Sequence, residues 1–245
     1  MKKTILTALA ALTCFAWAEA KEIKGTVKTV DGEALSGVVV SDGLNTTVTD
    51  SKGRFVMDAD SDSKFVFIST PSGYISETLE GETLYYKSIG KKVKSYDFLV
   101  KKNPKDDTNH NLIVVADPQI SDADEFPSLL EHSKFMGEYI KGMDSDYTFG
   151  LCLGDIVGWN HALYPEYNKV MSHTGIAFRN VMGNHDMTNY GRAHETSMTD
   201  YQKMFGPAWY SFNVGDVHYI VMNNNFFIGT DWYYIGYIEE RQLQW

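Results

Sequence analysis

Three apolar runs in the second half of the chain have the length of strands that are buried on both faces. They cover residues 112–116, 147–153 and 176–182, and each ends abruptly in polar or glycine residues. Between the first two runs, apolar residues recur at helical spacing: Phe126, Leu129, Leu130, Met136, Ile140 and Met143. Residues 163–171 can form a second helix before the third run. This alternation predicts an α/β domain with a parallel sheet over residues 111–245.

Residues 21–100 carry a different pattern, in which short β-rich runs alternate with turn sequences. The runs cover residues 38–40, 55–57 and 64–68. The turn sequences recur about every ten residues: Asp31-Gly32, Asp42-Gly43, Ser51-Lys52-Gly53 and Ser72-Gly73. This spacing predicts a small antiparallel β-sandwich. The polar residues 101–110 are predicted to form a linker to the second domain.

The β-sandwich segment shows no grouping of residues that points to catalysis. No histidine precedes His110, and the acidic residues are scattered among the turns. We therefore favour a structural or docking module over a second active site.

The region after residue 186 contains two further features. Residues 209–214 and 217–222 flank Gly215-Asp216, which predicts a hairpin, so this Gly-Asp pair is a turn and not a metal motif. The polar segment 187–206 contains His194 and Glu195. These two residues either shape a substrate opening or are bystanders near the site.

The first 20 residues are typical of a secretory signal peptide. Lys2 and Lys3 precede an apolar stretch over residues 5–18, and small residues that suit cleavage follow. The stretch is shorter than the roughly 20 residues of a transmembrane helix, so an uncleaved anchor is the less favoured alternative. Lipoprotein anchoring through Cys14 is not expected, because Thr13 is a poor residue before a lipidated cysteine. The protein is therefore expected to be secreted or periplasmic, with no transmembrane segment after signal removal.

Composition and charge narrow the function classes. Hydrophobic residues make up 43% and aromatic residues 13% of the chain, which suits a packed globular protein. The net charge of −10 argues against non-specific nucleic-acid binding. A phosphate-ester substrate stays possible, because bound divalent cations would reverse the local field. After signal removal only Cys152 is left, so no internal disulfide can form, and its position in an apolar run predicts a core residue. The sequence does not indicate an oligomeric state.

Polar side chains follow the three predicted strands at the point where each strand ends. Asp117 and Gln119 follow the first strand, Asp155 the second, and the sequence Gly-Asn-His-Asp at residues 183–186 the third. The intervals are 38 residues (117 to 155) and 29 residues (155 to 184), close to the size of a βαβ unit. Parallel strands connected by helices bring all three ends to one edge of the sheet, where α/β folds bind ligands.

This order of motifs resembles the calcineurin-like metallophosphoesterases, which hydrolyse phosphate esters at a two-metal centre. The resemblance covers residues 111–245 and implies a four-layer α/β/β/α sandwich that is incomplete in this chain. It further implies that Asp117 and Gln119 bind the first metal, that Asp155 bridges both metals, and that Asn184 binds the second.

The same resemblance implies catalytic roles for two neighbouring residues. His185 would lie on the leaving-group side, held by Asp186, and a hydroxide shared by the two metals would attack the phosphorus. Residues 24–55 resemble the carboxypeptidase-regulatory-like β-sandwich, in the form found ahead of some bacterial phosphoesterases.

The chain departs from the family pattern in three places. Gln119 replaces the more common histidine, and Gly158 stands where purple acid phosphatases have a metal-binding tyrosine. Both changes favour oxygen-rich coordination, so among Mn²⁺, Fe²⁺, Zn²⁺ and Mg²⁺ we slightly favour Mn²⁺ and expect a colourless protein. The further histidine and the Gly-His-x-His motif of the family are missing before Trp245. We therefore expect the chain to be a fragment of a longer protein, inactive as it stands.

Two alternatives from other classes stay open. One is a secreted β-sandwich binding module attached to a degenerate, inactive phosphoesterase scaffold. The other is a metal-independent hydrolase with a serine or cysteine nucleophile. Against the second, the chain has no Gly-x-Ser-x-Gly sequence, and Cys152 is expected to point into the core.

Overall fold

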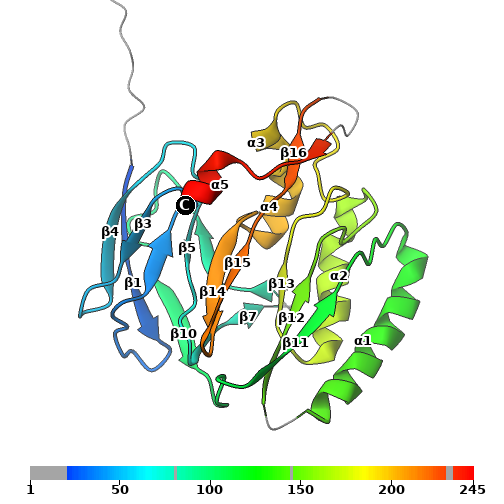
Figure 1. The fold of residues 1–245 in the computed structure, drawn as a ribbon, viewed down its shortest axis with the longest axis horizontal. Coiled ribbons are helices and arrows are strands. Elements are labelled where there is room, and N and C mark those ends of the chain that lie inside the picture. Colours follow the sequence, from blue (N-terminus) through cyan, green and yellow to red (C-terminus); the bar gives the residue numbers. More distant parts are fainter. Residues whose placement is uncertain (1–20, 80–81, 144–145, 230–233) are drawn as a thin grey trace, which may run out of the picture.

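The computed structural model describes residues 21–79, 82–143, 146–229 and 234–245, and its N-terminal part is a sandwich of two four-stranded sheets (Figure 1). The first sheet has the order β4-β1-β10-β6 and consists of Arg54–Ala59, Lys21–Thr29, Phe98–Lys102 and Tyr74–Ser76. The second has the order β3-β2-β5-β9 and consists of Thr46–Val48, Val39–Ser41, Phe65–Ile68 and Tyr86–Ser88. Alternate residues of β1 and β4 are buried, as expected for strands with one face on a core.

The structure confirms the predicted sandwich but corrects its strand pairing at one place. Strands β1 and β10 pair in parallel, whereas the other pairs of the two sheets are antiparallel. Adjacent strands connected by a hairpin turn are antiparallel, but β10 returns to β1 after most of the domain has been built. A long connection of this kind permits either direction, so the turn pattern could not reveal it.

A parallel sheet forms the centre of the second half, as the sequence predicts. It contains β11 (His110–Val115), β12 (Tyr147–Cys152) and β13 (Phe178–Asn180), paired in that order. Helices α1 (Phe126–Lys141) and α2 (Tyr164–Met171) connect the strands and lie together beside the sheet (Figure 1). Both helices begin with proline in the first turn, where its missing N–H is tolerated.

Two short strands cross the predicted boundary between the halves. Strands β7 (Thr78–Leu79) and β8 (Glu82–Thr83) extend the parallel sheet in the order β11-β12-β13-β8-β7, although they lie within the predicted sandwich segment. Such short strands carry no readable periodicity. The predicted linker, residues 101–110, is not a flexible connection. Strand β10 continues to Lys102, and the buried Asp107 accepts a hydrogen bond from the Gly73 N–H at 2.8 Å.

The predicted hairpin is present on the other face of the parallel sheet. Strands β14 (Tyr210–Val214) and β15 (Val217–Val221) pair antiparallel around the turn at Gly215-Asp216. The remaining elements are η1 Ala123–Glu125, η2 His161–Leu163, η3 Ser172–Thr174, α3 His194–Ser197, α4 Thr199–Phe205, β16 Asn225–Phe227, β17 Tyr234–Gly236 and α5 Glu240–Gln244. The described layers are thus α1 and α2, the parallel sheet and the hairpin, and a complete four-layer sandwich stays a prediction.

Two hydrophobic cores lie on the two faces of the parallel sheet. One packs the sheet and the hairpin against the sandwich, through Phe149, Phe212 and Phe67. The other packs the sheet against α1, α2 and α4, and includes Cys152, which is fully buried as predicted. Residues 1–20, where the sequence predicts a signal peptide, lie outside the described residues. No helix in the described part of the chain is long and apolar enough to cross a membrane.

Candidate metal centre

The carboxyl ends of β11, β12 and β13 lie level at one edge of the sheet. Val115 is opposite Cys152, and Cys152 is opposite Asn180. The three loops that leave this edge are bonded to one another. The Gln119 N–H donates to the Asp155 carbonyl oxygen at 2.8 Å, and the His185 N–H donates to Asp155 Oδ1 at 2.9 Å. The structure therefore places the three motifs together, with Asp155 between the other two.

The backbone at this edge adopts conformations that are uncommon for these residue types. Asp117 (φ 56°), Gln119 (φ 48°), Asp155 (φ 49°) and Trp159 (φ 70°) are the non-glycine residues with positive φ in the described part of the chain. Such conformations cost about 1–3 kcal/mol each and concentrate at functional sites. Three of the four are predicted metal ligands, so the strain gathers where the sequence places the site.

Two glycines allow the second and third loops to approach one another. A Cβ on Gly183 would lie 2.1 Å from both the N and Oδ1 atoms of Asp155. A Cβ on Gly154, which has φ 83°, would lie 2.7 Å from the Cα of Gly183. Any side chain at either position would push the loops apart, which explains the glycine before Asp155 and before Asn184.

The predicted ligands present oxygen atoms with little competition from other charges. Asp117 is exposed, and Gln119, Asp155 and Asn184 are half-buried. Within the described residues, neither aspartate forms an ion pair. Carboxylate and amide oxygens suit hard divalent cations, so the donor set fits the predicted chemistry. Two of the four predicted ligands, Gln119 and Asn184, are neutral amides. No group of three or more His, Cys, Asp or Glu residues that could hold a metal ion is found in the described part.

His185 is held by a tilted aromatic contact, and no hydrogen bond to its ring is seen among the described residues. Its ring centroid lies 4.3 Å from that of Trp159. Its Nδ1 atom is buried and has no hydrogen-bond partner among the described residues. A buried imidazole nitrogen without a partner is unusual.

Asp186 has a different role from the predicted one. It is fully buried, and its carboxylate accepts hydrogen bonds from the Gly183 N–H at 2.8 Å, the Tyr164 hydroxyl at 2.9 Å and the Ile156 N–H at 3.2 Å. No hydrogen bond joins Asp186 to the His185 ring among the described residues, so the expectation that Asp186 holds this ring is wrong. Burial raises the pKa of Asp186 to about 6, against the opposing effect of its N–H and hydroxyl donors. Asp186 fastens the third loop to the second loop and to α2.

Comparison with known families gives a match over the N-terminal part of the chain. Residues 21–103 match the family model described as "N terminal of Calcineurin-like phosphoesterase". The match supports the calcineurin-like phosphoesterase family. It ends just after β10 and so covers the sandwich together with β7 and β8. It does not describe a carboxypeptidase-regulatory-like domain, and that resemblance stays a prediction. No curated protein and no solved structure matches the chain.

Four residues near the site were not identified from the sequence. Trp159 contacts the His185 ring, and His161 Nε2 donates to the His185 carbonyl oxygen at 2.9 Å. His161 in turn contacts two further residues. The Tyr164 ring lies parallel to the His161 ring at a centroid distance of 5.2 Å, and Asp200 Oδ2 lies 3.3 Å from His161 Nδ1. The density of aromatic and histidine residues directly after Gly-Asp could have indicated the first three. Asp200 comes from α4, and only the fold brings it close.

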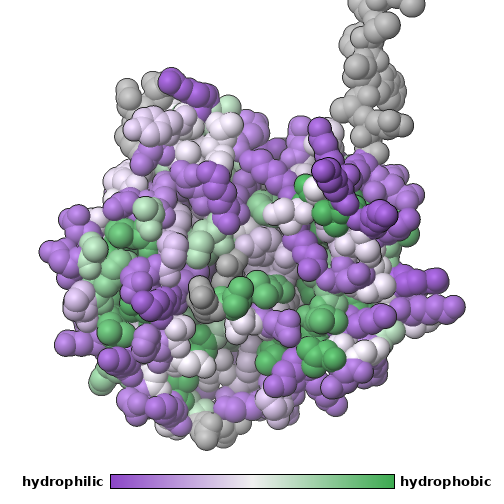
Figure 2. Space-filling view, turned by 180° about the vertical axis from the view of Figure 1, so that it is seen from behind, coloured by the Kyte–Doolittle hydropathy of each residue, from purple (hydrophilic) through white to green (hydrophobic). Residues whose placement is uncertain are grey.

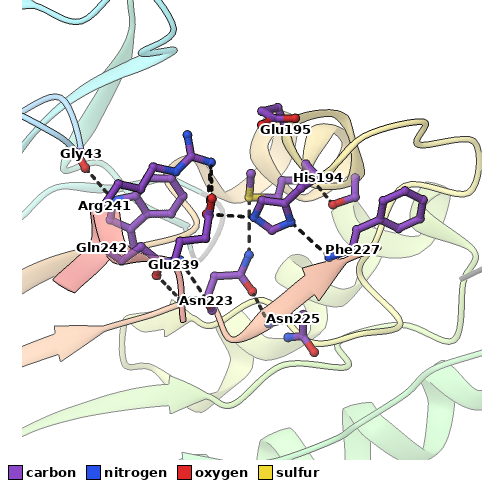
Figure 3. A network of polar contacts seen from close by, with 12 residues as sticks. Gly43, His194, Glu195, Asn223, Asn225, Phe227, Glu239, Arg241 and Gln242 are labelled. Atoms are coloured by element: carbon purple, nitrogen blue, oxygen red, sulfur yellow. Dashed lines mark hydrogen bonds and ion pairs between the residues drawn. The ribbon is translucent and has the colours of Figure 1, made fainter. Parts of the chain in front are cut away.

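A separate polar network anchors the segment that follows the third motif (Figure 3). His194 Nε2 lies 3.0 Å from Glu239 Oε2, and the Phe227 N–H donates to His194 Nδ1 at 3.2 Å. Because Nδ1 accepts, the ring proton lies on Nε2 and faces the Glu239 carboxylate. Asn225 Nδ2 donates to the Met182 carbonyl oxygen at 2.9 Å, which connects β16 to the loop after β13. His194 is thus a buried structural residue that fixes the segment 187–206.

We expect the His194→Gln substitution to reduce the fall of the free energy of unfolding with decreasing pH below about 6.5. Burial lowers the pKa of His194 although Glu239 acts in the opposite direction. The unfolded chain takes up this proton near pH 6.5, and the native state takes it up only at lower pH. The free energy of unfolding therefore falls as the pH drops below about 6.5.

Urea unfolding at several pH values between about 5 and 7.5 measures this effect. The matched control is His132→Gln, because His132 is exposed on α1. Parallel profiles for wild type and His194→Gln would show that His194 does not contribute to the acid sensitivity.

Proposed function

We propose that this protein is a metal-dependent hydrolase of phosphomonoesters or phosphodiesters. The observation that carries the proposal is the edge where Asp117, Gln119 and Asp155 share strained backbone conformations on adjacent loops. The family match over residues 21–103 also supports the proposal. Strand β8, within the matched residues, pairs with β13, so the matched region contributes a strand to the sheet that carries the site.

In the proposed site, Asp117 and Gln119 would hold one divalent cation, Asn184 would hold a second, and Asp155 would be shared by both. Together the cations would supply a hydroxide near neutral pH and neutralise charge on the phosphoryl group. Asp155 Oδ1 accepts the His185 N–H, and its other oxygen makes no hydrogen bond within the described residues. Asp155 therefore fixes the third loop with one oxygen, and the other oxygen would be available to the cations.

His185 provides the proton on the leaving-group side. The residue is half-buried, and its ring is positioned by contact with Trp159. A positioned imidazole that hydrogen-bonds the departing oxygen contributes roughly 10²–10⁴-fold in rate.

We favour Mn²⁺ among Mn²⁺, Fe²⁺, Zn²⁺ and Mg²⁺, because the first site offers oxygen ligands. Position 158 is a glycine, which offers no phenolate to a ferric ion. We therefore expect a colourless protein, and a strong tyrosinate-to-iron absorption would contradict this assignment.

The proposal includes export through residues 1–20 and a phosphate-ester substrate, without nucleic-acid binding by net charge. Burial raises the pKa of the Cys152 thiol to about 12, which argues against the cysteine-hydrolase alternative. The alternative that persists is a β-sandwich binding module on an inactive scaffold.

Two neighbouring substitutions test the division of roles. We expect His185→Ala to keep the wild-type cation stoichiometry and to lose hydrolysis by about 10²-fold or more, because only the proton donor is removed. Asn184→Ala should lower the stoichiometry from two cations to one. Equilibrium dialysis against Mn²⁺ measures binding by the chain. Turnover of p-nitrophenyl phosphate and bis(p-nitrophenyl) phosphate is measured on the longest natural form of the protein.

The matched control is Asn111→Ala, an amide removed from the opposite end of β11. Equal cation loss in the His185 and Asn184 variants would make His185 a ligand. A wild-type protein without cation binding or turnover would favour the binding-module alternative.

A further inference from the structure

A buried arginine lies away from the candidate metal centre, on the sandwich-facing side of the parallel sheet. Arg179 belongs to β13 and is 8% exposed. Its guanidinium carbon lies 4.2 Å from the ring centroid of Phe212, 4.6 Å from that of Tyr85 and 5.8 Å from that of Tyr210. The aromatic faces attract the cation and compensate part of the cost of burying it.

The hydrogen bonding of this guanidinium is incomplete. Nη2 donates to Thr70 Oγ1 at 2.9 Å, and Nη1 is buried without a partner in the described part of the chain. Within the same residues, Arg179 forms no ion pair with a carboxylate. A buried charge without a counter-ion is costly, and a free N–H on it is a strong donor for an oxyanion. Burial lowers the pKa of Arg179, as expected for a cation without a carboxylate partner.

Arg179 lines an open cavity of about 1040 Å³, large enough for a metabolite-sized ligand. The cavity lies between the sandwich and the start of β12 and β13, and its walls include Tyr147, Thr148 and Ile176. The candidate metal centre lies at the other ends of these strands, so the two sites are distinct. In Figure 2, which shows the molecule from behind, apolar side chains interrupt the hydrophilic surface in the middle of this face.

The charges around the cavity are opposite to those of the whole protein. The net charge of the chain is −10, but the described residues that line the cavity include four cations, Lys101, Lys105, Lys141 and Arg179, and one acid, Glu77. Of the four, Lys141 is paired with Glu138 at 2.7 Å, which leaves three against Glu77. Apolar walls come from Phe149, Phe212 and Val214. A positive field over an apolar wall suits an anion that also has an apolar body.

We propose that this cavity binds an organic anion, whose carboxylate or phosphate group pairs with Arg179 Nη1 and whose apolar body packs against Phe149 and Phe212. Two substitutions test this. Arg179→Met removes the charge at similar volume. Ile176→Glu places a negative charge, which would repel an anionic ligand, on a half-buried part of the cavity wall. Ile176→Gln is its neutral matched control.

Isothermal titration of the full chain with octanoate, octyl phosphate and the neutral octanol gives the affinities, with a chelator present to remove divalent cations. We expect the wild type to bind at least one of the two anions and to bind octanol much more weakly. Affinity should fall about tenfold or more in Arg179→Met and in Ile176→Glu, and stay within about threefold in Ile176→Gln.

The preferred anion identifies the head group, carboxylate or phosphate. If Arg179→Met fails to fold, the Ile176 pair and the side-chain ¹⁵N resonance of Arg179 during titration of the wild type still decide the question. No binding of either anion, equal binding of octanol, or unchanged affinity in both charge variants would overturn the proposal.

Discussion

Replacing Asp155 by asparagine is expected to abolish divalent-cation retention and phosphate-ester hydrolysis while the fold is kept. Asparagine preserves an oxygen that can accept the His185 N–H, now at 2.9 Å from Asp155 Oδ1. It removes the negative charge that the proposed bridging role needs. Substituting a residue that only supports a metal ligand lowers metal affinity or activity by about 10–100-fold. Loss of the proposed bridging carboxylate should therefore cost at least as much.

The test of Asp155→Asn needs a readout other than activity. Mn²⁺ binding is measured by equilibrium dialysis, and the fold is checked by circular dichroism and urea unfolding. Asp124→Asn is the matched control, because Asp124 is an exposed carboxylate in η1. Near wild-type Mn²⁺ binding by Asp155→Asn would show that Asp155 is not a metal ligand.

The sequence predicts the parts of the fold that depend on local patterns. The three parallel strands, the helix at Phe126–Lys141 and the hairpin turn at Gly215-Asp216 are confirmed because burial on two faces, helical periodicity and turn residues each leave a clear trace. The parallel pairing of β1 with β10 and the joining of β8 to β13 depend on contacts between distant segments. No local pattern specifies those contacts.

At the candidate site, too, local sequence patterns predict some features, whereas others depend on contacts made only in the fold. Strand-end motifs brought Asp117, Asp155 and Asn184 into consideration, and their loops do meet at one edge. The family resemblance assigned Asp186 to the His185 ring, but its carboxylate is used by backbone and phenol donors instead. Burial decides this, because a fully buried carboxylate must first be satisfied by the donors that surround it.

The structural role of Asp186 leads to the largest expected effect on stability. We expect Asp186→Ala to lower the free energy of unfolding by about 2–4 kcal/mol at pH 7.5, because three donors lose their acceptor. The loss is partly offset, since burial raises the pKa of Asp186 and the substitution removes an ionised group that the native state holds at a cost. Those donors are the Gly183 N–H, the Ile156 N–H and the Tyr164 hydroxyl. Tyr164→Phe removes only one of the three and should cost about 1 kcal/mol.

The double variant Asp186→Ala/Tyr164→Phe distinguishes this network from a general packing defect. Once the carboxylate is absent, removing the hydroxyl relieves an unpaired donor, so the double variant should be more stable than the sum of the single effects by about 1 kcal/mol. Urea unfolding measures all three variants, and the exposed Asp124→Ala should change stability by less than about 0.5 kcal/mol. Strict additivity, or a loss below about 1 kcal/mol for Asp186→Ala, would show that Asp186 does not fasten the third loop. If Asp186 fastens the third loop, Asp186→Ala should also bind Mn²⁺ more weakly than the wild type, because Asn184 lies on that loop.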